Sequence, residues 1–353
     1  MAMTPRECVL TAWRGGMPDR VPFAIWHTKL FPPDYPPLLE AGACIIVKSH
    51  VYRIEYDGAA VETRKHTGTA GAECTRTTYH TRAGDLATVT SHSLATTWTR
   101  ERLFKSPADY DALIALAEDA RFVPTYEQFA ADDARHGDRG LARPAPIRTP
   151  MYEIIHEIMG AETFSVELAE RPDRVDALYD ALLARRRRAL AVLADSPAKI
   201  AAIEGNVCFE IVGPDRFRRY HHPAIEEACA LCRSRAILTG AHLDGNCRAM
   251  APLIAATSLD CVEAFTPPPD CDLPVADARR AWGGKGLFLN FPSSVHLAGR
   301  DAVLDRARRI LTEAAPGDGL IVGCTEDIPT NDHLAPLARL VRDEGKLPLA
   351  NPP

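Results

Sequence analysis

The chain has 353 residues, of which 46% are hydrophobic and 25% charged, so it can bury a large core beneath an ordinary charged surface. Its formal net charge of -6, without a long block of like charges, argues against nucleic acid as a partner. No apolar run reaches the roughly 20 residues of a membrane span, so we expect a cytoplasmic protein without membrane contact. The ten cysteines are scattered along the chain and should be mostly reduced thiols.

Short apolar runs separated by helical patterns are typical of buried parallel strands. The predicted strands are Val21–His27, Ala43–His50, Ala145–Thr149, Lys199–Glu204, Ala236–His242, Leu259–Glu263, Gly286–Asn290 and Gly319–Cys324. Alternation of these runs with helices predicts an α/β fold, a single (β/α)8 TIM barrel that forms one domain over residues 1–353.

Three segments depart from the strand and helix alternation. Residues 51–102 are rich in Thr, Val, Tyr and Gly, which predicts an inserted β-hairpin region. Residues 126–143 are interpreted as a helix and loop that lead into the third strand. Residues 172–195 are strongly helical, and the arginine run 185–188 within them is interpreted as a solvated helix face.

Polar residues that close an apolar run deserve most weight, because the active sites of parallel barrels form at the carboxyl ends of the strands. Reactive side chains close or directly follow six of the predicted strands. They are His27, His50, Glu204, Asn206, His242, Asp244, Glu263 and Cys324.

The segment 239–247 is the most informative of these strand ends. His242 and Asp244 are two residues apart on an extended strand end and point the same way, so both could bind one metal, or Asp244 could orient the His242 imidazole. The alternative is a helix cap formed by Asp244 or Asn246, with His242 packed at the rim.

The remaining strand ends have structural alternatives of comparable weight. Cys324 closes the last strand, where a neighbouring strand could bring it near His242, but a buried cysteine is also a common core residue. Glu204 and Glu263 could bind a metal or substrate or act as general acids, and rim salt bridges explain them nearly as well. Cys229 and Cys232 form a CxxC in a helical stretch, where a structural role is favoured. Nucleotide-binding, serine-hydrolase and zincin motifs are absent from the sequence.

The order of these features resembles the uroporphyrinogen-decarboxylase superfamily over nearly the whole chain. The landmarks are Arg6 to Pro22, His242 to Gly245, Trp282 to Lys285 and Gly319 to Pro329. True uroporphyrinogen decarboxylases carry an arginine-rich RQAGR-like element after the first strand, whereas this chain has the stretch 27–34, which reads HTKLFPPD. Without those guanidinium groups, tight binding of a many-carboxylate porphyrinogen is not expected.

The chain looks closer to the corrinoid-linked methyltransferases of the same superfamily. These bind zinc through a His-x-Cys pair and a distant cysteine, and His242 and Cys324 match two of the three positions. Asp244 stands where the middle cysteine is expected, and an oxygen ligand makes zinc a harder, stronger Lewis acid. The resemblance therefore implies zinc held by His242, Asp244 and Cys324, which suits an oxygen-bound methyl group better than a thiol.

On this resemblance we predict a methyltransferase or demethylase that moves a methyl group from a methyl ether or methylamine to cobalamin on a partner corrinoid protein. The predicted catalytic residues are His242, Asp244 and Glu263, and the predicted substrate-binding residues are His27, Glu204 and Asn206. One alternative is a metal-free decarboxylase in which His242 and Asp244 act as an acid/base pair and Arg20 or Lys48 holds a carboxylate. Another is a non-catalytic barrel that binds a corrinoid or small ligand. A homodimer is left open.

Overall fold

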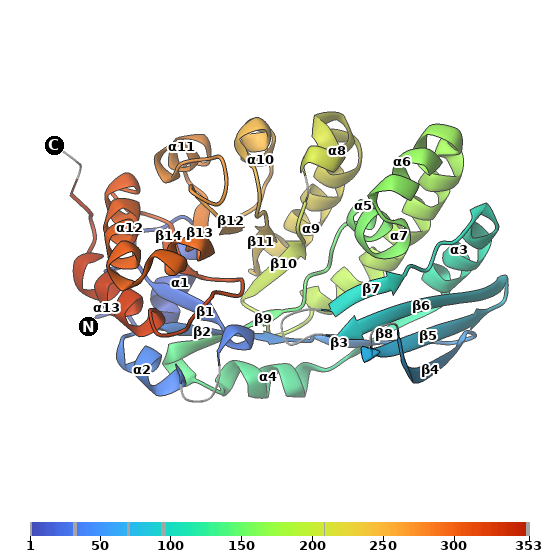
Figure 1. Cartoon of the computed structure of the whole chain (residues 1–353), viewed down its shortest axis with the longest axis horizontal. Coiled ribbons are helices and arrows are strands. Elements are labelled where there is room, and N and C mark those ends of the chain that lie inside the picture. Colours follow the sequence, from blue (N-terminus) through green and yellow to red (C-terminus); the bar gives the residue numbers. More distant parts are fainter. Residues whose placement is uncertain (1, 31–33, 69–70, 93–96, 208, 351–353) are drawn as a thin grey trace. The chain divides into compact units, whose positions relative to one another are not determined.

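A computed structural model describes residues 2–30, 34–68, 71–92, 97–207 and 209–350 (Figure 1). Its largest sheet has eight parallel strands in the order β10-β11-β12-β13-β14-β1-β2-β9. These strands are β1 (Phe23–Trp26), β2 (Cys44–Ser49), β9 (Gly140–Pro144), β10 (Ile200–Glu204), β11 (Leu238–His242), β12 (Cys261–Phe265), β13 (Gly286–Asn290) and β14 (Leu320–Cys324). The end strands β9 and β10 lie side by side, although no ladder joins them within the described ranges. The sheet is a nearly closed barrel, which confirms the predicted (β/α)8 fold.

The strand predictions fail at one position. Seven predicted runs overlap the observed strands, but the run 145–149 is extended loop, and the third barrel strand is β9, which begins five residues earlier. The charged Arg143 interrupts the apolar pattern of β9, so the strand is hidden in the sequence. It is buried all the same, because a carboxylate inside the barrel compensates its charge.

Chain contacts divide the molecule into two compact units. The first contains residues 1–51, 125–146 and 194–353, and the second contains residues 52–124 and 147–193. This division does not test the prediction that residues 1–353 form a single domain, which stays a prediction.

The first unit holds the barrel strands and most of the helices (Figure 1). Its helices are α1 (Pro5–Trp13), α2 (Tyr35–Glu40), α4 (Tyr126–Ala134), α8 (Phe209–Arg216), α9 (His222–Ser234), α10 (Ala251–Ala255), α11 (Val275–Ala281), α12 (Arg300–Glu313) and α13 (Leu334–Glu344). Short helical turns add η1 (His27–Lys29), η5 (Gly137–Arg139), η7 (Phe217–His221), η8 (Arg248–Met250) and η9 (Ser293–Ala298).

Helix α1 closes the amino-terminal end of the barrel. A capping box between Thr4 and Glu7 starts the helix, and Trp13 at its last position is fully buried. The Trp13 indole donates a hydrogen bond to the Thr239 carbonyl at 3.3 Å and packs edge-on against Phe288. A Cβ at Gly240 would lie 2.6 Å from the Trp13 ring, so only glycine fits there. Solvent therefore reaches the barrel from the carboxyl ends of the strands.

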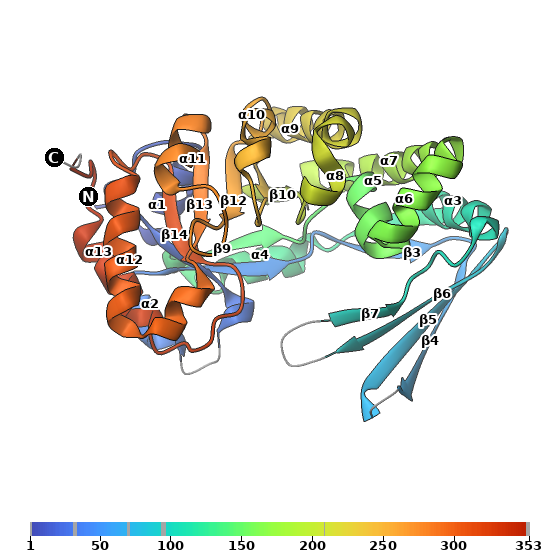
Figure 2. The same ribbon diagram turned by 45° about the horizontal axis from the view of Figure 1, so that its top comes forward.

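The second unit is built from the insertion and from the helices that precede β10. Strand β3 (Tyr52–Tyr56) pairs antiparallel with β8 (Ala120–Pro124). A four-stranded antiparallel sheet follows β3, with α3 (Tyr110–Asp119) against β5 and β6 (Figure 2). Its strands are β4 (Ala60–Thr67), β5 (Glu73–Thr81), β6 (Gly84–His92) and β7 (Thr97–Glu101). The predicted β-hairpin insertion is confirmed, and β8 extends it to residue 124.

The remaining helical segments of this unit are η4 (Pro107–Asp109), α5 (Pro150–Tyr152), η6 (Glu153–Met159), α6 (Ala161–Glu170) and nearly all of α7 (Pro172–Ala194). The interpretation of the arginine run in α7 as a solvated face is wrong for half of its members. Arg185 forms a salt bridge with Glu153, and the buried Arg186 donates to the Arg148 carbonyl at 3.0 Å. These two guanidinium groups tie α7 to the segment 147–153, and Arg187 and Arg188 are exposed.

Candidate functional site

Strand register identifies the side chains that face the inside of the barrel. Lys48 pairs with Arg143, and His242 pairs with Glu263, so each pair lies on one face of the sheet. Inner residues one pleat below them, among them Ile46, Leu141 and Cys261, belong to the apolar core. We call the inner residues at the carboxyl ends of the strands the upper layer; they are Trp26, Lys48, Arg143, His242, Glu263 and Asn290.

Trp26 lies at the centre of the upper layer. The Lys48 Nζ is 3.5 Å from the centre of its indole ring, and the Arg143 Cζ is 5.3 Å from the ring. The imidazole of His242 lies at 5.4 Å, ring centre to ring centre. Trp26 therefore contacts the predicted catalytic histidine and, separately, two cationic side chains.

Arg143 and Glu263 form a salt bridge inside the barrel. Nε and Nη2 of Arg143 donate to the same carboxylate oxygen, Oε2, at 3.1 and 2.5 Å. The arginine is 1% exposed and the glutamate 0%. Because desolvating two charges is costly, such a pair contributes little net stability, yet loss of one partner is strongly destabilising.

His242, Asp244 and Asn206 form a hydrogen-bonded chain at the rim. The Nε2 of His242 is 3.3 Å from Oδ2 of Asp244, and the Asn206 amide donates to the same oxygen at 3.1 Å. His242 is buried, whereas Asp244 is partly exposed. The predicted pair is therefore brought together, with the carboxylate on the solvent side of the imidazole.

Glu204 is buried among partners of its own. Its Oε1 accepts from the Gly205 amide at 2.9 Å, and its Oε2 is 3.0 Å from Nδ1 of the buried His221. The pair His221-His222 precedes Pro223 in the sequence, and nothing in the sequence ties His221 to Glu204. Both glutamate oxygens are therefore in contact with protein groups.

His27 lies in η1, where its ring is fixed by the backbone. Its Nδ1 accepts a hydrogen bond from the Lys48 amide at 3.0 Å, and burial lowers the pKa of the imidazole. The ring is therefore uncharged near neutral pH, with its proton on Nε2. Of the stretch 27–34, residues 31–33 lie outside the described residues.

Cys324 lies on the other face of β14 from the upper layer. It pairs in register with Ile25, whereas the inward-facing Gly323 pairs with Ala24 of the core. Burial raises the pKa of the Cys324 thiol to about 12, so it is protonated at neutral pH. Within the described ranges, no three His, Cys, Asp or Glu side chains are close enough to share a metal ion. The predicted trio of His242, Asp244 and Cys324 does not fit zinc in this arrangement.

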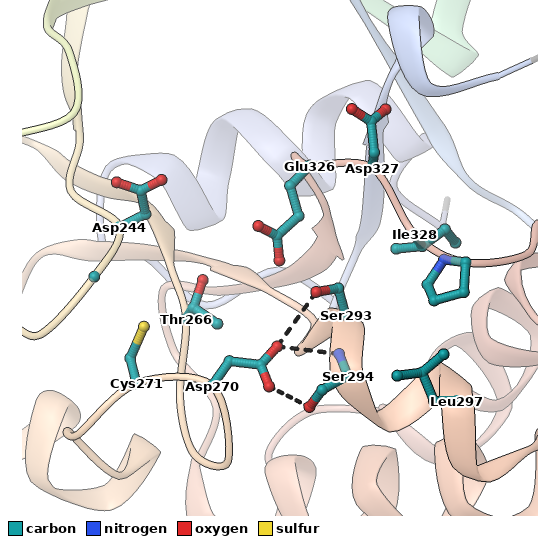
Figure 3. Close-up of a pocket in the computed structure, with 12 residues that line it drawn as sticks. Asp244, Thr266, Asp270, Cys271, Ser293, Ser294, Leu297, Glu326, Asp327 and Ile328 are labelled. Carbon is teal, nitrogen blue, oxygen red and sulfur yellow. Dashed lines mark hydrogen bonds between the residues drawn. The ribbon is translucent and has the colours of Figure 1, made fainter. Parts of the chain in front are cut away.

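A pocket of about 610 Å³ opens beside Asp244 over the ends of β11 to β14 (Figure 3). Four carboxylates line it, from Asp244, Asp270, Glu326 and Asp327, and the lining contains no basic side chain. Asp270 accepts from the Ser294 amide at 3.2 Å, and Asn290 of the upper layer donates to Glu326 at 2.6 Å. Burial raises the pKa of Glu326. The pocket therefore favours ligands with hydroxyl or ammonium donors.

Sequence reasoning missed Trp26 and Arg143 as site residues. The sequence pattern placed Arg143 in a loop, because the third barrel strand was predicted at residues 145–149. The proline in Ala142-Arg143-Pro144 could have indicated that a strand ends there. Arg20, which was predicted as an alternative ligand for a substrate carboxylate, lies before β1. Its backbone forms an isolated β-bridge with Lys346, and its guanidinium donates to the Met3 carbonyl. It is at the amino end of the strand and cannot contact the upper layer.

The fold and its polar carboxyl end define a (β/α)8 barrel with a candidate enzyme site. No protein-family model matches the chain, and no curated protein matches its sequence. Among solved structures the chain is similar to a methyltransferase from Methanosarcina mazei, with a TM-score of 0.60 and 12% identity over 97% of this chain and 99% of that one. This likeness shows a shared fold over the full length.

Two further structures are much less similar. One is an L-Ala-D/L-Glu epimerase, with a TM-score of 0.21 and 12% identity over 86% of this chain and 92% of that one. The other is a dipeptide epimerase from Methylococcus capsulatus, with a TM-score of 0.19 and 14% identity over 80% and 92%. In the described part of the chain, no helix is both long and apolar enough to span a membrane.

Proposed function

We propose that this protein is a methyltransferase that demethylates a small methyl ether at the carboxyl end of its barrel. The observation that carries the proposal is the His242–Asp244 pair, which lies between the aromatic Trp26 and the carboxylate-lined pocket. The full-length likeness of the fold to a methyltransferase supports it. The sequence resembles the corrinoid-linked methyltransferases, and from that resemblance we include cobalamin on a partner corrinoid protein as the acceptor of the methyl group.

The histidine and aspartate suit the departure of an ether oxygen. When the methyl carbon leaves, the oxygen keeps the bonding electron pair and must take up a proton. In this proposal His242 donates that proton, and Asp244 holds the imidazole in position through its contact with Nε2. Hydroxyl groups of the substrate would donate to Asp270 and Glu326 in the pocket. Cobalamin, when bound, supplies the nucleophile that accepts the methyl group.

Zinc belongs to this proposal only as far as the sequence resemblance carries it. His242 and Asp244 offer a metal two adjacent ligands, but Cys324 faces away from them. The role of His242 as proton donor needs no metal. Elemental analysis of protein purified without chelator or metal affinity resin tests for zinc directly, and repeating it on Asp244→Ala tests the ligand.

The proposal is tested by methyl transfer to reduced cobalamin. The full chain is incubated with reduced cobalamin and a panel of small hydroxylated methyl ethers, and methylcobalamin is followed by its absorbance. We expect product with the wild type and a loss of about 100-fold or more for His242→Ala. Asn246→Ala is the matched control, because Asn246 lies in the same loop but contacts Glu210. No product from any ether, or equal rates in both variants, overturns the proposal.

A carboxy-lyase is the second candidate, and a specific observation favours it. Lys48 and Arg143 place two cations beside Trp26, where the carboxylate of a substrate could bind before it leaves as carbon dioxide. If the wild type released carbon dioxide from small hydroxy acids and Lys48→Met did not, the carboxy-lyase would replace the methyltransferase as the proposed function.

A further inference from the structure

Two buried polar atoms of the upper layer have no hydrogen-bond partner among the described residues. They are the indole Nε1 of Trp26 and the Oε1 of Glu263. Trp26 is 6% exposed and Glu263 0%, so bulk water does not satisfy either atom. One is a donor and the other is an acceptor.

Both atoms belong to one cluster, because Arg143 contacts both residues. Its guanidinium holds Oε2 of Glu263 and lies against the Trp26 ring. Glu263 is also the register neighbour of His242, whose ring packs on Trp26. The arginine thus satisfies one carboxylate oxygen, and the other has no hydrogen-bond partner among the described residues.

Unmet buried donors and acceptors are rare in folded proteins, because each has given up its hydrogen bonds to water without gaining a new partner. One unpaired donor and one unpaired acceptor in the layer that carries the candidate site indicate a missing ligand group. A hydroxyl fits both needs, because its oxygen accepts a hydrogen bond from an N–H and its proton is donated to a carboxylate.

We propose that Trp26 Nε1–H and Glu263 Oε1 bind a free hydroxyl group of the substrate inside the barrel. The inference rests on the proposed function in that it takes the ligand to be the methylated substrate, which would carry a hydroxyl beside its ether. An ordered water has the same donor and acceptor chemistry, and the experiment separates the two occupants.

Two of the other three tryptophans provide internal references. Trp13 donates to the Thr239 carbonyl at 3.3 Å, and Trp282 donates to the Ala251 carbonyl at 3.0 Å. Their indole N–H groups are already bonded within the protein, and they should not respond to a hydroxyl probe. Trp26→Phe keeps an aromatic ring but has no indole N–H, so the signal that disappears in this variant is assigned to Trp26 in a nuclear magnetic resonance spectrum.

The test uses the full chain labelled with ¹⁵N-tryptophan, titrated with phenol and, as the matched probe, with anisole. The two differ only in whether the oxygen carries a proton or a methyl group. We expect phenol to shift the Trp26 indole signal and leave those of Trp13 and Trp282 in place. Anisole should bind at least about tenfold more weakly, because it cannot donate to Glu263. Glu263→Gln should weaken phenol binding while the two reference signals show that the variant is folded.

Equal responses to phenol and anisole, or none to either, would overturn the inference. The inference would also be overturned if the Trp26 N–H exchanged magnetisation with a bound water and this exchange persisted in the presence of phenol. Because the readout involves no methyl transfer, a phenol response without methylcobalamin formation would leave the hydroxyl site standing while the proposed function fails. Methyl transfer without a phenol response would leave the proposed function standing while the hydroxyl site fails.

Discussion

Asp244 is the residue on which the polar groups of the barrel mouth converge. A single oxygen, Oδ2, is shared by His242 and Asn206, and the same residue lines the pocket. Such a carboxylate fixes the orientation of an imidazole and stabilises its charged form when a proton is taken up. Because Asp244 is partly exposed, its replacement should affect chemistry more than folding.

We expect Asp244→Asn to lower the rate of methyl transfer by about tenfold or more, because the amide cannot stabilise a protonated imidazole. The free energy of unfolding should change by less than about 1 kcal/mol. Steady-state rates and urea unfolding measure the two effects. An unchanged rate would show that the His242–Asp244 contact is structural.

His296 gives a pH-dependent contribution to stability. It is buried in η9 with its Nδ1 3.3 Å from that of His333, and burial, aided by His333, lowers its pKa to about 4. The unfolded chain takes up this proton near pH 6.5 and the folded chain does not, so stability present above pH 6.5 is lost as the pH falls toward 4.

Wild-type protein should therefore lose roughly 3 kcal/mol of unfolding free energy between pH 7 and pH 4 through this residue. His296→Phe should flatten the curve by that amount, whereas the exposed His66 replaced by Phe should not. Urea unfolding at a series of pH values measures the difference. Parallel curves for wild type and His296→Phe would refute the assignment.

At the scale of elements, β9 and β12 are joined across the barrel by Arg143 and Glu263. These strands are not neighbours in the sheet, so the salt bridge spans the interior. Core layers below it are apolar, and α1 closes the opposite end. The salt bridge therefore lies at the carboxyl end of the barrel, above the apolar core.

Arg143→Met should destabilise the protein by about 3–5 kcal/mol, because it leaves the Glu263 carboxylate buried without a cation. Adding Glu263→Gln should recover part of that loss, since the double variant contains neither charge. Chemical unfolding of the single and double variants gives the coupling. Additive losses would mean that the two side chains do not interact.

For the whole molecule, the register of the nearly closed barrel determines which strand ends share an interior. His242 and Cys324 both end strands at the same rim, yet they lie on opposite faces of the sheet. We expect Cys324→Ala to leave methyl transfer within about twofold of wild type and to cost about 1–2 kcal/mol of stability as a small cavity. Elemental analysis should find equal zinc contents in Cys324→Ala and in the wild type. Loss of both zinc and activity in Cys324→Ala would overturn the register argument.

The sequence by itself determined the barrel, because period, length and spacing of buried strands are local properties that seven of eight runs displayed. It also determined the β-hairpin insertion and the adjacency of His242 and Asp244, which are two residues apart on one strand end. Only the tertiary structure decided that Arg143 is a buried partner of Glu263, 120 residues away, and that Cys324 faces outward. Charge compensation and strand register arise between distant segments, and neither leaves a pattern within any one of them.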